Sequence, residues 1–412
     1  MAEFLINSGW NPNLAQIVAS TLGAVVLASF GLVWVIFSIW LERKFAGRVQ
    51  DRIGPNRTGP YGLFQTFADI GKLLTKEDIT PEGADKHVYN FAPILAVAGI
   101  IAIFAVIPFN HAWVGADLNV GVLYFVAVGS LATLAILLAG WSSNNKYALL
   151  GAFRAIAALI SYEVPMILSL AVPVLLAGSM SMQDIVKGQS IAYVFVVPVS
   201  ALIFFVSQLA EVGRSPFDLI EAESEIIAGF NIEYSGMKFA MFYAGEFIHA
   251  FVICILTAVL FLGGLGAGEP GYELFGFLML MAKSVAVYAF VMLLRNTLPR
   301  IRIDHMMAFN WKFLVPLALV NLLVVTFLAR PFVPNYAAAE ALVAEGGLAG
   351  LIGTIFGAGF IAELPRAVVL LVANVILFVV ATQLLHRYGE TQRSKLGVQA
   401  VPPMRATAMA SD

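Results

Sequence analysis

The segment LAQIVASTLGAVVLASFGLVWVIFSIWL, residues 14–41, decides the fold of this chain. It contains no ionisable side chain, and it exceeds the ~20 residues that an α-helix needs to cross a bilayer. It is also longer than the apolar core of a secretory signal peptide, so we expect it to remain as the first transmembrane helix. This segment alone predicts a protein that is inserted in a membrane.

Composition extends this prediction to the whole chain. Hydrophobic residues make up 60% of the 412 residues and charged residues only 12%, against roughly 45 to 50% apolar residues in ordinary globular domains. Further apolar stretches of about the length of a membrane span lie at residues 91–109, 119–140, 156–178, 191–211, 241–264, 275–294, 312–330 and 366–386. We therefore expect an all-α polytopic membrane protein with eight or nine transmembrane helices.

Lysine and arginine residues orient these spans. The connection between the first two spans holds eight of them, the next connection, residues 110–118, holds none, and the alternation continues along the chain. Because positively charged loops stay in the cytoplasm, we expect the N-terminus outside. The first, third, fifth and seventh connections are then structured cytoplasmic loops.

The loop at residues 211–233, EVGRSPFDLIEAESEIIAGFNIE, is the most informative one for function. It places six carboxylates and one arginine, Arg214, between two apolar segments. Ionisable groups near membrane depth are costly, and by default they indicate an ion, proton or substrate pathway. Six carboxylates beside one fixed positive charge cannot all ionise independently. The alternative is a solvated acidic loop, but the interleaved Phe, Ile and Gly residues favour a packed segment.

Glu163, Glu211 and Glu246 stand among apolar neighbours inside expected helices. They should face the bundle interior, because a charged side chain that faces lipid costs about 2.5 to 3.5 kcal/mol on insertion scales. Buried carboxylates that exchange protons are the expected composition of a proton relay. The alternative is structural, with internal salt bridges from these acids to Arg154, Arg214 and Arg295.

Residues 42–78 form a second informative block. The string GPNRTGPYG, residues 54–62, predicts a rigid turn. An amphipathic helix in the membrane interface should follow, because apolar residues recur at helical spacing at Leu63, Phe67, Ile70 and Leu74. Two charged pairs at the polar boundary are either topological anchors or the rim of a chamber that opens into lipid: Glu42 with Arg43, and Asp51 with Arg52.

We do not expect this chain to build a redox centre. Its single cysteine, Cys254, excludes an iron–sulfur cluster, which needs several cysteine ligands. The five histidines show no paired spacing that suits a haem or a metal, and we interpret the intramembrane His249 as a packing residue. No metal site, no cofactor bound by this chain and no nucleic-acid partner are therefore expected.

Four strings together resemble one family: ERKFAGRVQDRIGPNRTGPYGLFQTFADIGKLLTKE (42–77), RAIAALISYE (154–163), AEVGRSPFDLIEAESEIIAGFNIEY (210–234) and LRNTLPRIRIDHMM (294–307). The family is the quinone-site membrane subunit, known as the H subunit, of NADH-quinone oxidoreductase, the bacterial respiratory complex I. The likeness runs from about Leu41 to Ala329, and GPNRTGPYG and RSPFDLIEAESE are its most specific strings. It implies a subunit of eight tilted helices in the bacterial cytoplasmic (inner) membrane.

The resemblance also implies a function that is shared with other subunits. A quinone, the substrate, enters a chamber from the bilayer near the first helix and the amphipathic helix, and its reduction drives proton translocation. The electrons come from NADH through FMN and iron–sulfur clusters in partner subunits. The implied partners are hydrophilic peripheral-arm subunits at the cytoplasmic loops, other membrane-arm subunits, the quinone and the lipid bilayer.

Motif positions imply the residues that carry these roles. The residues that match the quinone chamber are Glu42, Arg43, Arg52, Asp69, Lys72 and Arg214, the last in the loop that couples the chamber to proton movement. The residues that match the proton relay are Glu163, Glu211, Glu221, Glu223, Glu225, Glu233 and Glu246.

The resemblance ends before the chain does. Residues 1–330 correspond to the core of eight helices, and residues 331–386 form an extension with a ninth span expected at 366–386. Residues 346–362 are expected to span, re-enter or lie at the interface, and residues 387–412 to form a flexible cytoplasmic tail.

Two other functions stay open at this point. A homologous subunit of a membrane-bound hydrogenase, or of another donor-linked oxidoreductase, uses the same scaffold. A stand-alone proton-coupled secondary transporter would use the same acids, but it should show inverted repeats and interrupted half-helices, and no repeat is evident. A passive membrane anchor leaves the buried acids unexplained.

Overall fold

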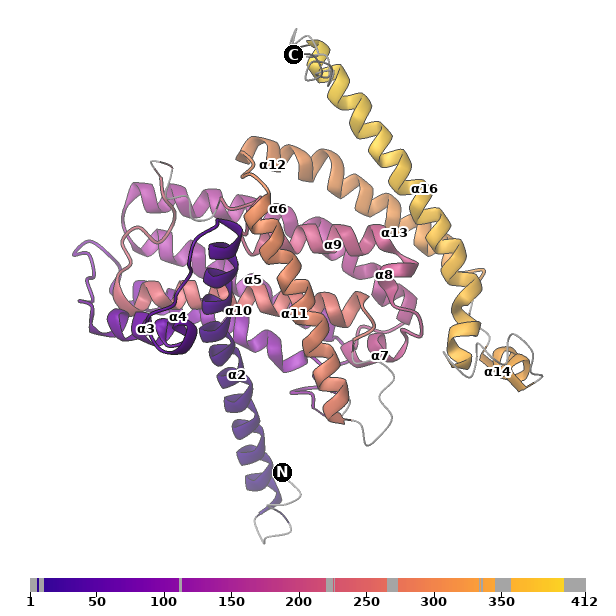
Figure 1. Ribbon diagram of the computed structural model, residues 1–412, viewed down its shortest axis with the longest axis horizontal. Coiled ribbons are helices and arrows are strands. Elements are labelled where there is room, and N and C mark those ends of the chain that lie inside the picture. Colours follow the sequence, from indigo (N-terminus) through magenta and orange to yellow (C-terminus); the bar gives the residue numbers. More distant parts are fainter. Residues whose placement is uncertain are drawn as a thin grey trace, which may run out of the picture.

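The computed structural model describes residues 6, 11–110, 113–219, 225, 227–264, 273–332, 334, 336–344 and 357–395. Every regular element within these residues is helical (Figure 1). Eight helical segments are long and apolar enough to cross a membrane. The predicted all-α polytopic membrane protein is therefore confirmed.

The helical segments follow the apolar stretches of the sequence. Those that are long enough to span a membrane are α2 (Pro12–Val49), α4 (Lys86–Ile103) with the 3₁₀ turn η2 (Phe104–Val106), α5 (Gly121–Ser142), α6 (Lys146–Ala177), α10 (Gly236–Phe261), α11 (Glu273–Thr297), the run of α12 (Ile303–Phe309), the π-helical η3 (Asn310–Leu314) and α13 (Val315–Ala329), and α16 (Ala358–Lys395). The shorter elements are η1 (Pro60–Gly62), α3 (Gln65–Thr75), α7 (Met182–Lys187), α8 (Tyr193–Val196), α9 (Pro198–Glu211) and α14 (Tyr336–Ala344).

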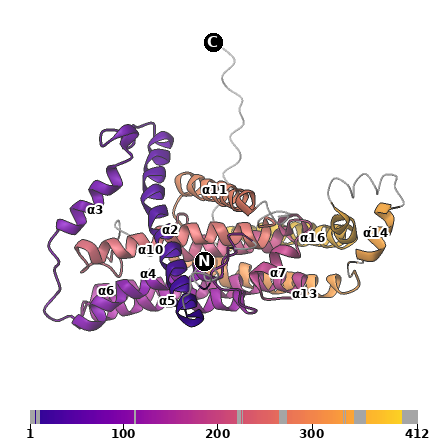
Figure 2. The ribbon, with the colours of Figure 1, turned by 90° about the horizontal axis from the view of Figure 1, so that it is seen from below.

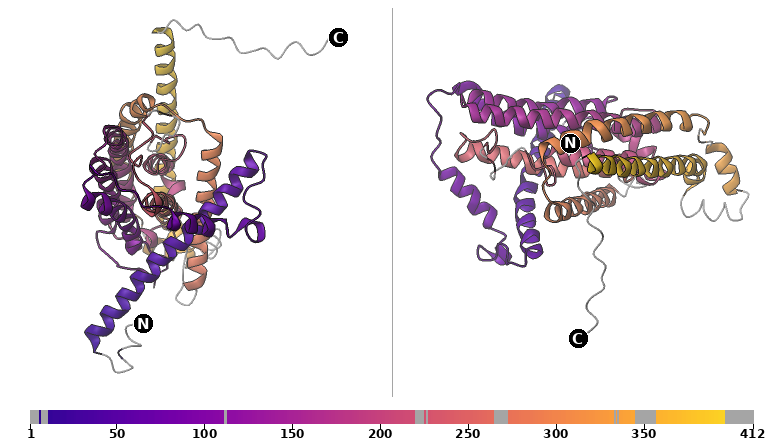
Figure 3. Two further views of the ribbon diagram at one scale, coloured as in Figure 1. Left: turned by 90° about the vertical axis from the view of Figure 1, so that its left-hand side faces the viewer. Right: turned by 90° about the horizontal axis from the view of Figure 1, so that it is seen from above.

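Helix α10 forms the centre of the bundle. Every residue from Phe247 to Phe261 is buried, as expected of a helix that is apolar around its whole circumference. Figure 2 shows α10 between α11 on one side and α4, α5 and α6 on the other. Helix α2 crosses this arrangement at a steep angle (Figure 3) and contacts α10 and α11.

The apolar stretch at residues 191–211 forms a broken helix rather than one continuous span. Helix α8 ends at Val196 and α9 begins at Pro198, with Val197 between them in a non-helical conformation (φ −132°, ψ 65°). A residue that precedes proline avoids the helical region, whereas proline suits the first turn of a helix. The 14 residues of α9 reach about 21 Å at ~1.5 Å per residue, less than the ~30 Å of a bilayer core.

The predicted amphipathic helix is α3, which lies outside the main bundle (Figure 2). It begins at Gln65 because Pro60–Gly62 form the turn η1, where Tyr61 and Gly62 adopt φ angles of 56° and 75°. Two of its apolar side chains, Phe67 and Leu74, are 52% and 63% exposed. Exposed apolar groups on a charged helix suit a position in the membrane interface.

Helix α16 lies at one edge of the molecule in the view of Figure 1 and packs against α8, α9, α13 and α14. The ninth span expected at 366–386 falls within it, and the helix continues to Lys395, into the predicted tail. Residues 345–356, most of the segment expected to span, re-enter or lie at the interface, are outside the described residues. The division into core, extension and tail stays a prediction.

Candidate functional site

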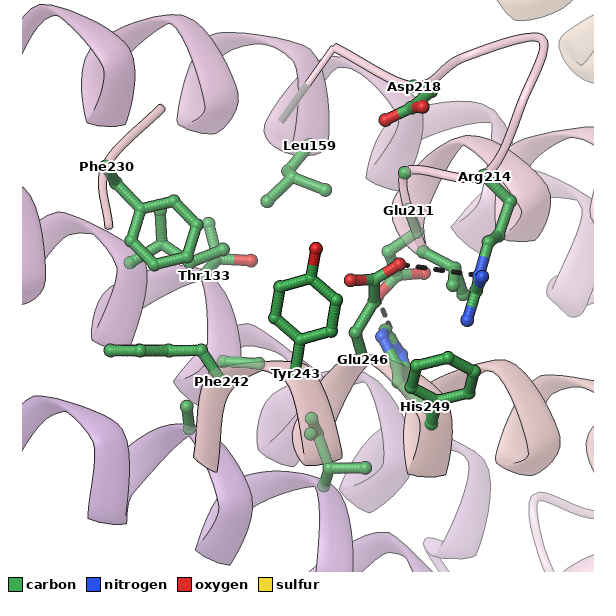
Figure 4. Close-up of a pocket in the computed structure, with 18 of the residues that line it drawn as sticks. Thr133, Leu159, Glu211, Arg214, Asp218, Phe230, Phe242, Tyr243, Glu246 and His249 are labelled. Atoms are coloured by element: carbon green, nitrogen blue, oxygen red, sulfur yellow. Dashed lines mark ion pairs between the residues drawn. The ribbon is translucent and has the colours of Figure 1, made fainter. Parts of the chain in front are cut away.

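A cavity of about 400 Å³ lies between α4, α5, α6, α9 and α10. Figure 4 shows Tyr243 and Glu246 pointing into it from α10, with Phe230 and Phe242 on the side opposite Arg214. The ionisable side chains that line it, tyrosine aside, are Glu211, Arg214, Asp218, Glu246, His249, Arg295 and Arg300. The cavity therefore brings together acids and bases from segments that are distant in the sequence.

The end of α9 positions two of these side chains through a Schellman motif. The N–H of Gly213 donates to the carbonyl of Ala210 at 3.1 Å, and the N–H of Arg214 donates to the carbonyl of Leu209 at 3.3 Å. This motif requires a left-handed residue after the helix, and Gly213 supplies it with φ 68°. The short string EVGR thus ends the helix at Glu211 and turns Arg214 back into the bundle.

Arg214 is the centre of the site, and its side chain is only 2% exposed. Its Nη1 donates to Oε2 of Glu42 on α2 at 3.0 Å, and its Nε lies 3.4 Å from Oε1 of Glu246 on α10. The guanidinium also lies over the Phe247 ring, 4.6 Å from the centroid. Burial lowers the pKa of Arg214, but the carboxylates of Glu246 and Glu42 raise it by more, so the pKa lies above its ordinary value. Arg214 is therefore a fixed positive charge that joins α2 to α10.

Glu42 accepts from three groups, none of which is its neighbour Arg43. Besides Arg214, Tyr288 donates its hydroxyl to Oε1 at 2.6 Å, and Arg295 pairs with Oε2. Adjacent residues on a helix point in different directions, so Glu42 and Arg43 diverge. Residues 288 and 295 both belong to α11, and Glu42 therefore ties α2 to that helix as well.

Glu211 lies in a different environment from Glu246. Gln208 donates Nε2 to Oε2 of Glu211 at 3.0 Å, and Nε2 of His249 lies 3.8 Å from Oε1. Glu163 is close enough for its charge to interact with that of Glu211, and Thr133 on α5 hydrogen-bonds to Glu163. Within the described ranges no arginine or lysine forms an ion pair with Glu211 or Glu163. The salt-bridge interpretation therefore fits Glu246 but not these two acids.

Sequence reasoning did not include His249, Tyr243 and Arg295 among the site residues. Tyr243, Glu246 and His249 recur every three residues on α10, and side chains three apart share a helix face. This spacing predicts that Tyr243 and His249 lie on the same helix face as Glu246. His249, interpreted as a packing residue, in fact lines the cavity. Arg295 was considered only as a salt-bridge partner, and its contact with Glu42 depends on the packing of α11 against α2.

Other predicted chamber residues lie apart from the cavity, on α2, on α3 and in the turn between them. Nη1 of Arg43 lies 2.5 Å from Oδ2 of Asp69, an ion pair that joins α2 to α3. Arg52 is exposed and donates Nε to Oε1 of Gln50 at 2.7 Å. Lys72 is exposed on α3. Among these predicted chamber residues, Arg43 and Asp69 form the ion pair that joins α2 to α3 in the described part of the chain.

The remaining predicted relay residues occupy the loop between α9 and α10. Glu225 pairs with Arg154 on α6 and with Arg300, whose Nη2 lies 2.7 Å from Oε1. Because Arg300 lines the cavity, Glu225 is one contact removed from it. Oε1 of Glu233 accepts from Asn145 at 2.5 Å, away from the cavity lining. Glu221 and Glu223 lie outside the described residues.

The fold and the site define a class of protein: a multi-pass helical membrane protein with a partly open cavity that is lined by acids and bases from several helices. In the part of the chain that the structure describes, no three His, Cys, Asp or Glu side chains gather closely enough to hold a metal.

Comparison with known proteins identifies the family. The family model for NADH dehydrogenase matches residues 22–326. The H subunit of NADH-quinone oxidoreductase from Dehalococcoides mccartyi (strain CBDB1) is 49% identical over 303 residues, which cover 74% of this chain and 85% of that protein. The proteins of the same name from Brevibacillus brevis and Geobacillus sp. (strain WCH70) are 44% and 42% identical over 76% and 81% of this chain, and over 93% and 100% of their own lengths.

The chain therefore belongs to the family of NADH-quinone oxidoreductase H subunits and is a membrane subunit of that respiratory-chain enzyme, complex I. The family indicated by the four sequence strings is therefore confirmed. The region that the family model matches ends at residue 326, before α14 and α16.

Proposed function

We propose that this chain forms the wall of the quinone chamber and the entry of a carboxylate relay that couples quinone reduction to proton translocation. It would lie in the bacterial cytoplasmic membrane with its N-terminus outside. Its cytoplasmic loops would dock the hydrophilic subunits that carry FMN and the iron–sulfur clusters. The names of the relatives support the redox role, because each is a subunit of a quinone-reducing enzyme.

The observation that carries the proposal is the sharing of one buried guanidinium between two acids. Arg214 contacts Glu42 on α2, the helix that also contacts α3, and Glu246 on α10, which faces the cavity with Glu211. A proton gained or lost by either acid changes how strongly that acid holds Arg214. A change of charge at Glu42, toward the chamber, would therefore alter the electrostatic environment of Glu246, in the relay.

The cavity contains the groups that a relay needs. Among the described residues, Nε and Nη2 of Arg214 and Nε2 of His249 are buried without a hydrogen-bond partner in the protein. Buried polar atoms of this kind are ordinarily satisfied by water. We propose that water in this cavity connects Glu246 with Glu211, and that Glu163 next to Glu211 receives the proton.

The chamber part of the proposal is tested at Arg43 and Asp69. Either Arg43→Ala or Asp69→Asn removes the ion pair that joins α2 to α3. We expect quinone reductase activity to fall several-fold in the assembled complex, while NADH oxidation with a water-soluble artificial acceptor persists. Arg330→Ala, at an exposed arginine just after α13 and outside the proposed docking loops, is the matched control. Equal loss of both activities would mean failed assembly, whereas full quinone reductase activity in an assembled variant would contradict a chamber role.

The orientation is tested by cross-linking. Cysteines introduced at Thr58 and Ser215, in the first and fifth connections, should capture hydrophilic subunits of the complex. The native thiol does not interfere, because Cys254 is buried. A cysteine at Asn119, which lies between η2 and α5 on the opposite side, should capture none of them. Equal capture from Asn119 would overturn the proposed orientation.

A further inference from the structure

Helix α16 makes polar contacts with the two helices that carry Glu163 and Glu211. Its Asn374 side chain is completely buried, and Oδ1 accepts from the N–H of Val199 at the start of α9 at 3.3 Å. Arg366 donates Nη2 to the carbonyl of Leu176 in the last turn of α6 at 2.9 Å. Glu363, 7% exposed, accepts from the backbone of Ile191 just before α8.

The break between α8 and α9 leaves backbone N–H groups at the start of α9 that need hydrogen-bond acceptors from elsewhere. The first N–H groups of a helix have no partner within it, and an unsatisfied backbone group inside a membrane is costly. Pro198 has no N–H, and α9 has no capping side chain of its own. The Val199 N–H, the first in the helix, finds its acceptor on α16. The Asn374 amide is fixed in this orientation, because its Nδ2 donates to the Leu370 carbonyl at 3.0 Å.

The same end of α9 is tied to α6. Ser200 donates its hydroxyl to the carbonyl of Ser169 on α6 at 2.9 Å. Glu211 is the last residue of α9, so a helix of only a few turns connects the contact at Val199 to the carboxylate in the cavity. A shift at the start of α9 therefore moves Glu211 relative to Glu163.

We propose that α16, which lies beyond the end of the family-model match at residue 326, positions the carboxylate relay by capping α9 through Asn374 and α6 through Arg366. Asn374 is thus a positioning residue for Glu211 rather than a member of the relay. This inference rests on the proposed function of Glu211.

The test compares Asn374→Leu, which keeps the size but deletes the acceptor, with Asn374→Asp, which retains an acceptor suited to a helix N-terminus. Thr382→Val is the control, because its exposed hydroxyl donates only within α16, to Val379. Amide hydrogen exchange of residues 199–211 is measured in the whole purified complex. We expect roughly three- to tenfold faster exchange in Asn374→Leu, the effect of losing a cap. Exchange in Asn374→Asp and Thr382→Val should stay at the wild-type rate.

Turnover supplies the second readout. In Asn374→Leu the kcat for quinone reduction should fall with an unchanged KM for quinone, as in Glu211→Asp, and Asn374→Asp should restore it. Asn374→Ala deletes the same oxygen without an apolar branch and replaces the leucine variant if that variant does not assemble. Unchanged exchange overturns the proposal, and so does faster exchange with unchanged kcat. A Glu211→Gln variant with full turnover and pumping overturns the relay itself, and exchange in α9 distinguishes the two failures because it is measured without turnover.

Discussion

Arg214→Met should destabilise the subunit by about 3 to 5 kcal/mol, because removing one partner of a buried ion pair leaves the other charge uncompensated. Methionine fills much of the same space, so the loss is mainly electrostatic. Glu42 keeps Arg295, whereas Glu246 loses the only basic group with which it forms an ion pair in the described residues. We expect little assembled complex and little quinone reductase activity, measured by native electrophoresis and by quinone-dependent NADH oxidation.

A double variant shows whether the buried charge is the cause. Arg214→Met with Glu246→Gln removes the uncompensated carboxylate and should recover part of the lost assembly. Arg330→Met is the control at an exposed arginine outside the proposed docking loops, where a surface substitution changes stability by about 0.5 kcal/mol or less. Equal loss of assembly in the single and double variants would show that Arg214 does not act through its charge on Glu246.

Glu211→Gln should assemble normally and lose about tenfold or more of quinone-linked proton pumping. Glutamine accepts the hydrogen bond from Gln208 as glutamate does, and no arginine pairs with Glu211 among the described residues, so the structural cost is small. It cannot titrate, so it cannot relay a proton. Glu211→Asp keeps the titration and should retain more activity. Pumping is measured in vesicles that contain the assembled complex.

Two comparisons sharpen this result. Glu340→Gln, at an exposed carboxylate on α14, should behave as the wild type. Glu246→Gln should reduce pumping too, but with some loss of assembly, because it leaves Arg214 with one acid instead of two. Full pumping in an assembled Glu211→Gln variant would remove that residue from the relay.

Much of the fold was predictable from local patterns. The lengths of the apolar stretches predicted eight or nine spans because a helix in lipid must satisfy its own backbone hydrogen bonds. The spacing of Leu63, Phe67, Ile70 and Leu74 predicted α3. The break before Pro198 was visible in the sequence, because proline disfavours a helical residue ahead of it. It was nevertheless missed, since hydropathy does not register one non-helical residue.

The sequence predicted several of the ionisable residues that the candidate site contains, but not which of them contact one another. Acids among apolar residues indicate a buried site wherever they fall, and Glu211, Glu246 and Arg214 do meet at one cavity. Glu42 was matched with Arg43 because the two are adjacent, whereas its partners Tyr288 and Arg295 lie about 250 residues further along the chain. Partners of this kind depend on which helices pack together.

The sequence by itself therefore determined the membrane location, the helical class and the family, because these follow from hydrophobic length, backbone chemistry and contiguous motifs. Only the tertiary structure decided which charges neutralise one another and what supports α9. The contact of Arg214 with Glu42 spans 172 positions of the chain, and its contact with Glu246 spans 32. The contact of Asn374 with Val199 at the start of α9 spans 175. The physical reason is that a buried charge or backbone N–H must find a partner within hydrogen-bond reach. Helix packing, which no local pattern encodes, brings that partner into place.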